Sequence, residues 1–145
     1  MISPVWVEEA VVTAIHRRQL AEHGGSDGIR ERGLLESALY RPKNQYAYGN
    51  PSIFDLAAAY GYGIGETRRS SALGNPKLTP AKNHLFADGN KRTSYVVMRT
   101  FLRLNGYDIR ASAIEKYKVW IRLADSQINE TDLAEWIESK SVAVK

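Results

Sequence analysis

The 145-residue chain contains no cysteine. It can therefore form no disulfide, no thiolate site for zinc or an iron–sulfur cluster, and no cysteine nucleophile. Long hydrophobic runs are missing too, because no stretch approaches the roughly 20 apolar residues that cross a bilayer. The charge is nearly balanced, with 20 Lys and Arg against 16 Asp and Glu, and the basic residues form no clustered stripe. The lack of cysteine is compatible with a reducing cytoplasm, and we expect no direct contact with membranes or nucleic acid.

The overall composition is typical of an ordinary globular domain. The chain is 43% hydrophobic and 25% charged, and it shows no internal repeat and no linker between two halves. Its length suits one hydrophobic core. We therefore expect residues 1–145 to form a single domain.

Helical periodicity dominates the chain and predicts an all-α bundle of about six helices with almost no strand. Ser3 and Pro4 favour a helix start, Pro42 is expected to end the second helix, and Ser52 is expected to cap the third. The predicted helices cover 3–23, 31–40, 52–64, 90–105, 112–124 and 129–140. The helix predicted over 90–105 has the strongest apolar face of the six, so we expect it to be the central helix.

Three stretches between or within these helices have a composition of their own. Residues 41–51 are predicted to be irregular, with a short extended piece around 45–48. Residues 65–81 hold two Gly and two Pro without a sustained period and are expected to form an unusually long loop. The glycines of 61–65 lack the strand that precedes a nucleotide-binding glycine motif, so they indicate a helix surface that needs close approach.

The segment HLFADGNKRT, residues 84–93, carries the chemistry. Lys91 and Arg92 fall in the first turn of a helix, where each cation costs about 0.3–1 kcal/mol against the helix dipole. A bound phosphate would offset that cost, and Gly89 would let the backbone approach it closely. Asp88 is a hard oxygen ligand suited to magnesium. His84 could take a proton from an attacking hydroxyl.

Each residue of this segment also has a simpler interpretation. Asp88 or Asn90 could serve only as a helix N-cap, and a single histidine is more often structural than catalytic. Phe86 is a core anchor under either interpretation, and the two cations could be solvated surface charges. The order and spacing of all these residues together favour the chemical interpretation.

The segment resembles the signature of the Fic/Doc family, H-x-F-x-[DE]-x-N-[GK]-R, with all six defining positions present. The stretches AIHRRQLAEHGG, GIRERGLLESAL, FDLAAAY and VVMRTFLRLNGY are similar to the small death-on-curing toxins of that family. The resemblance spans nearly the whole chain apart from residues 65–81, which we regard as an insertion. It implies a compact helical bundle with a short flap and an active-site loop that precedes the central helix.

The resemblance assigns a role to each motif residue. His84 matches the general base that deprotonates a target hydroxyl, and Phe86 matches the hydrophobic anchor of the loop. Asp88 matches the Mg²⁺ ligand. The phosphates of ATP would be held by the segment Gly89, Asn90, Lys91 and Arg92.

Lys91 indicates the branch of the family. Relatives that transfer AMP have Gly at this position and a second Arg three residues after the first, where this chain has Tyr95. The combination resembles the death-on-curing branch, which transfers the γ-phosphate to a threonine of elongation factor Tu and is restrained by a separate antitoxin. Two alternatives stay open: an AMP-transferring enzyme, and a catalytically impaired protein gated by the 65–81 insertion.

Two further features follow from the same resemblance. Residues 41–51 correspond to the flap that aligns the target peptide by backbone pairing, so Tyr46 and Tyr48 are candidate target contacts, with simple aromatic packing as the alternative. Relatives that inhibit themselves carry [ST]-x-x-x-E-[GN]. The stretch from Ser126 to Thr131 is a near match that ends in Thr, and an inhibitory role is the less favoured interpretation.

Overall fold

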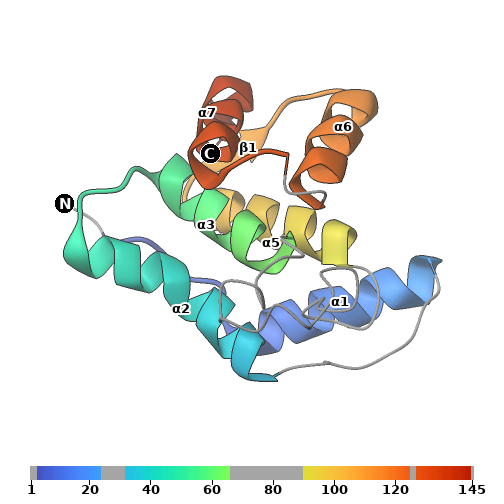
Figure 1. Ribbon diagram of the computed structural model, residues 1–145, viewed down its shortest axis with the longest axis horizontal. Helices are drawn as coiled ribbons and strands as arrows, with labels where there is room; N and C mark the ends of the chain where they lie inside the picture. The colour runs from blue at the N-terminus through green and yellow to red at the C-terminus, as the bar shows by residue number, and fades with distance from the viewer. Residues whose placement is uncertain (1–2, 24–31, 66–89, 125–126, 145) are drawn as a thin grey trace.

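The computed structural model describes residues 3–23, 32–65, 90–124 and 127–144 (Figure 1). Within these ranges the chain forms six helices and two short strands, which confirms the predicted all-α class. The elements are α1 (Glu9–His23), α2 (Arg32–Tyr48), α3 (Ile53–Gly65), α5 (Asn90–Leu104), β1 (Tyr107–Ile109), α6 (Ala113–Ala124), α7 (Glu130–Lys140) and β2 (Ser141–Ala143). No helix in the described ranges is both long and apolar enough to cross a membrane.

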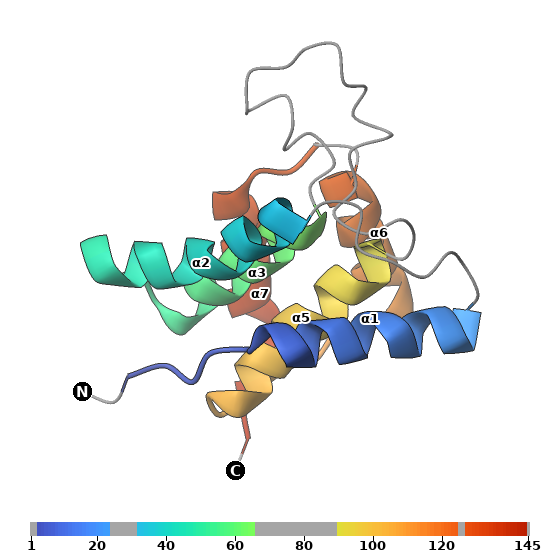
Figure 2. The ribbon, with the colours of Figure 1, turned by 90° about the horizontal axis from the view of Figure 1, so that it is seen from below.

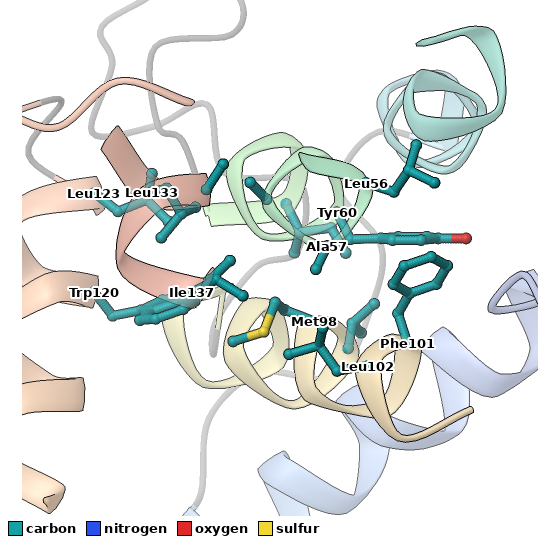
Figure 3. Close-up of a cluster of buried hydrophobic side chains, with 14 of the residues drawn as sticks. Leu56, Ala57, Tyr60, Met98, Phe101, Leu102, Trp120, Leu123, Leu133 and Ile137 are labelled. Atoms are coloured by element: carbon teal, nitrogen blue, oxygen red, sulfur yellow. The ribbon is translucent and has the colours of Figure 1, made fainter. Parts of the chain in front are cut away.

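The core lies between α3 and α5 (Figure 3). Both helices bury a row of large side chains completely. Helices α6 and α7 close the core on the side opposite α1 and α2. The fully buried large residues of the central pair are Leu56, Tyr60, Ile64, Met98, Phe101 and Leu102. The prediction that α5 is central is therefore confirmed.

Two glycines of α3 allow neighbouring helices to approach closely. A Cβ added at Gly61 would lie 3.4 Å from Cδ2 of Leu133 and 3.6 Å from Cζ2 of Trp120. A Cβ added at Gly63 would lie 3.4 Å from Cβ of Ala38 on α2. The interpretation of 61–65 as a closely packed helix surface is confirmed for these two positions.

Local signals place several helix ends correctly. At the start of α3, the Ser52 hydroxyl accepts from the Asp55 amide (3.1 Å) and the Asp55 carboxylate accepts from the Ser52 amide (2.9 Å). Ser112 and Glu115 make the same reciprocal pair at the start of α6. After α5, Gly106 adopts a φ of +92°, which glycine takes without strain.

The first helix begins later than the sequence predicts. The structure starts α1 at Glu9, and residues 3–8 run without regular secondary structure. The Val5 amide donates to Oδ1 of Asn105 (2.8 Å), and the Val7 amide donates to the Tyr60 hydroxyl (3.0 Å). These partners lie 100 and 53 residues away, so no local pattern could reveal that they hold the segment extended.

The prediction that Pro42 ends the second helix is also wrong, because α2 continues through Pro42 to Tyr48. Glu130 of α7 contacts α2 on both sides of the proline: Nε of Arg41 lies 2.9 Å from Oε1 of Glu130, and Nε2 of Gln45 lies 2.6 Å from Oε2 of the same carboxylate. Proline lacks the amide proton that would bond to the preceding turn. The side-chain contacts with α7 help to offset that loss.

A small antiparallel sheet joins the end of α5 to the end of the described chain. β1 pairs with β2, with Asp108 opposite Val142. The Asp108 carboxylate accepts two hydrogen bonds from the Arg99 guanidinium (2.8 and 3.1 Å), which hold the pKa of Asp108 below its usual value. The 65–81 insertion lies outside the described residues except for Gly65, which ends α3. Its conformation therefore stays a prediction.

Candidate active site

The motif enters the central helix, as the resemblance implies. α5 begins at Asn90, so Asn90, Lys91 and Arg92 form its first turn, and the Arg92 side chain is exposed. The remaining residues of the motif lie outside the part of the chain that the structure describes: His84, Phe86, Asp88 and Gly89.

The start of α5 is positively charged. Its first turn contains no acidic residue, a feature that it shares with α2, whereas α1, α3, α6 and α7 all begin with at least one. Helix N-termini carry a partial positive charge and unpaired amides, and the cations Lys91 and Arg92 add to that charge. The arrangement suits an anion such as a phosphate group.

Buried polar side chains that follow this first turn connect it to neighbouring helices. Thr93 and Ser94 are fully buried, and Oγ1 of Thr93 lies 3.1 Å from Nδ1 of His16, itself only 2% exposed. The Ser94 hydroxyl donates to the Gly61 carbonyl (2.7 Å) and accepts from Nε1 of Trp120 (2.9 Å). Helices α1, α3 and α6 therefore all contact the start of α5 through hydrogen bonds.

Sequence reasoning missed these supporting residues. Thr93 and Ser94 directly follow the motif and interrupt the apolar face of α5, which was a usable signal. His16 carried no signal of its own, because its partner lies 77 residues away. Only the fold brings the two together (Figure 2, where α1 crosses α5).

By the resemblance, Tyr95 stands at the position where AMP-transferring Fic proteins have a second Arg. Its ring meets Trp120 edge-on at 5.1 Å, and Nζ of Lys116 lies 5.3 Å from the ring centroid. Its hydroxyl oxygen is buried and has no hydrogen-bond partner within the described ranges. Tyr95 thus packs into the surrounding helices and supplies no cation at this position.

The two candidate flap residues lie on a helix, not on an extended segment. Tyr46 packs edge-on against Trp6 with the ring centroids 5.8 Å apart, and Tyr48 is 86% exposed. The expected extended piece around 45–48 is corrected, because the backbone there belongs to α2. A helical backbone cannot pair with a peptide by strand addition. For Tyr46, the packing interpretation fits the structure.

The near match to an inhibitory sequence has a structural use in this chain. The Glu130 carboxylate accepts from Arg41 and Gln45, and the Arg41 guanidinium also lies 5.4 Å from the centroid of the Tyr62 ring. Glu130 therefore connects α7 to α2. Ser126 lies outside the described residues.

The described ranges contain no group of three or more acidic or histidine residues that could hold a metal ion. The predicted Mg²⁺ ligand, Asp88, precedes α5 by two residues and is not among the described residues. The described portion can offer phosphate-binding groups at the start of α5. Magnesium binding therefore stays a prediction.

Comparison with curated proteins agrees with the motif. Over 91 residues, the chain is 34% identical to Toxin Doc of Mycolicibacterium smegmatis; the match covers 61% of the chain and 57% of that protein. The chain is similar to Doc toxins. It is also 27% identical over 97 residues to Protein kinase doc of Escherichia phage P1, covering 66% and 64% of the two proteins. The chain therefore spans less than two thirds of the length of either Doc relative. No family model matches the chain.

Proposed function

We propose that the protein is a Doc-like toxin that transfers the γ-phosphate of ATP to a protein hydroxyl. The observation that carries the proposal is the complete H-x-F-x-[DE]-x-N-[GK]-R match with Lys91 at its variable position. The similarity to Toxin Doc and to a protein named a protein kinase supports it. So does the start of α5, which carries two cations and no acidic residue.

The proposed chemistry follows from the residue types. His84 accepts the proton of the target hydroxyl, whose oxygen forms a new bond to the γ-phosphorus. The bond from that phosphorus to the bridging oxygen breaks, and ADP leaves with the electron pair. Lys91, Arg92 and the first amides of α5 would hold the phosphate oxygens, because phosphoryl transfer asks a protein mainly for positioning and charge neutralisation.

Magnesium and the protein partners belong to the same proposal. Asp88 would hold Mg²⁺, which would neutralise part of the charge on the phosphates when bound. The proposed target is a threonine of elongation factor Tu, whose phosphorylation would halt translation. The proposed partner is an antitoxin protein that restrains the enzyme in the bacterial cytoplasm.

Expression in bacterial cells tests the proposed function. We expect the wild-type chain to stop growth and amino-acid incorporation, and His84→Ala to remove both effects, because losing an acid–base group lowers rates by about 10²- to 10⁴-fold. Arg18→Ala is the matched control, since the Arg18 side chain is 80% exposed on α1. Growth arrest by His84→Ala at equal expression would contradict the assignment of the base.

A further inference from the structure

The start of α5 is held by hydrogen bonds that an ordinary helix core would not need. Thr93 and Ser94 are fully buried, and both use their hydroxyls on neighbouring helices. Burying a hydroxyl without a partner costs free energy, and an apolar residue of similar shape often packs equally well. The two hydroxyls instead fix the orientation of the start of α5, since a hydrogen bond weakens steeply when its distance or angle changes.

The His16–Thr93 contact restrains α5 directly beside Arg92, a predicted phosphate-binding residue. Thr93 directly follows Arg92; its side chain is buried, while that of Arg92 is exposed. Neighbouring residues on a helix are fixed relative to each other, so anything that sets the rotation and height of Thr93 also sets those of Arg92. His16 reaches Thr93 from the middle of α1, at 3.1 Å.

A second bridge restrains the same turn from another side. The Ser94 hydroxyl lies between the Gly61 carbonyl of α3 (2.7 Å) and the indole nitrogen of Trp120 on α6 (2.9 Å). With contacts to α1, α3 and α6, the first turn can neither rotate nor slide without losing a buried hydrogen bond. The remainder of the inward face of α5 is apolar and packs without such direction.

We propose that His16 is a positioning residue: through Thr93 it fixes the start of α5, and with it Arg92, in the orientation that phosphate binding and transfer require. The proposal rests on the proposed function for its catalytic consequence. A misplacement of about 1 Å at a reacting group can cost about 10²-fold in rate. The pair is thus expected to act on the transfer step more than on overall stability.

Three substitutions on α5 test the proposal. Thr93→Val removes the hydroxyl and keeps the shape, whereas Thr93→Ser keeps the hydroxyl and removes a methyl group. Thr100→Val is the matched control, because the Thr100 hydroxyl donates only within α5, to the Val96 carbonyl at 2.7 Å. We expect kcat to fall about 10- to 100-fold in Thr93→Val. Thr93→Ser and Thr100→Val should stay close to wild type.

The partition between kcat and KM, together with a mutant cycle, separates positioning from simple destabilisation. Assays are run with each variant shown to be folded at the assay temperature. If the two residues act through one contact, His16→Leu combined with Thr93→Val should be no slower than His16→Leu alone. Independent, multiplying effects would overturn the pairing. So would wild-type kcat in Thr93→Val, or an equal loss in Thr93→Ser.

Hydrogen exchange gives a readout that does not depend on enzymatic activity. We expect the amides near the start of α5 to exchange faster in Thr93→Val than in Thr100→Val, while amides later in α5 change equally in both. If the wild type transfers no phosphate, the proposed function fails, and this measurement still decides whether His16 and Thr93 position the turn. Unchanged exchange at the start of α5 would overturn the proposal in either case.

Discussion

Lys91 is the residue on which the predicted reaction depends. In the Fic/Doc resemblance, Gly at this position accompanies AMP transfer, and we propose that Lys91 fills the space that Gly would leave open. We therefore expect Lys91→Gly to weaken γ-phosphate transfer. Any AMP transfer that appears should be poor, because the packed ring of Tyr95 supplies no second cation. Thin-layer separation of the products from doubly labelled ATP measures both reactions, and unchanged γ-phosphate transfer would show that Lys91 is only a surface charge.

Tyr60 gives a residue-scale prediction about pH. Burial raises the pKa of its hydroxyl to about 12 from an ordinary value of 10.0, and the hydroxyl accepts from the Val7 amide. We expect Tyr60→Phe to cost about 1–3 kcal/mol near pH 7, because the buried amide loses its acceptor. Ionisation above pH 10 favours the unfolded state, where the phenol ionises more easily.

The difference in free energy of unfolding between wild type and Tyr60→Phe should therefore be constant below pH 10 and shrink as the pH rises towards about 12. Urea unfolding at a series of pH values measures this difference. Tyr117→Phe is the control, since Tyr117 is 68% exposed on α6. A difference that stays constant across the alkaline range would contradict the account of Tyr60.

At the residue scale, the sequence reveals the motif but not the distant residues that hold it in place. The motif is local, so the segment from His84 to Arg92 could be recognised from its spacing alone. The residues that hold it in place come from distant elements: His16 is 77 positions from Thr93, and Trp120 is 26 positions from Ser94. A single sequence contains no information that pairs them.

Among the elements, α2 depends on α7. After Pro42 the helix continues for six residues, and the Glu130 carboxylate accepts from Arg41 and Gln45 at its side. We expect Glu130→Ala to destabilise the protein by about 1–3 kcal/mol, because a charge-assisted hydrogen bond is lost and the partly buried guanidinium of Arg41 loses this carboxylate partner. Hydrogen exchange should increase most at the amides of 43–48, because Pro42 has no amide that bonds to the preceding turn and Gln45 would lose its contact with Glu130.

The matched control is an ion pair of the same kind on the surface. The Arg18–Glu22 pair on α1 has side chains that are 80% and 52% exposed. Such an i,i+4 pair is worth only about 0.3–0.5 kcal/mol, so Glu22→Ala should have a small effect. Equal losses of stability in Glu130→Ala and Glu22→Ala would contradict the role assigned to Glu130.

The same comparison explains which elements could be predicted. The starts of α3 and α6 follow from capping pairs three residues apart, and both were located from Ser52 and Ser112. The start of α1 and the end of α2 depend on long-range partners, and both predictions were wrong. Local rules gave an early helix start at Ser3 and a helix end at Pro42, and tertiary contacts overrode them.

At the scale of the whole molecule, the arrangement explains how a short motif becomes a site. α3 and α5 form the buried centre, α1 packs against α5, and α6 and α7 cover the other side (Figures 1 and 2). The start of α5 is the one end of this central pair at which the described residues place cations without acidic neighbours in the first turn. The helix order and the central position of α5 were predictable from periodicity, whereas the packing partners were not.

The transfer of the γ-phosphate is the central claim, and labelled ATP tests it most directly. Purified protein is incubated with elongation factor Tu, Mg²⁺ and ATP labelled at either the α or the γ position, with His84→Ala as the inactive control. We predict that label enters elongation factor Tu on a threonine from the γ position alone, and that His84→Ala transfers none. Label entering from the α position, or no label from either position, would contradict the account.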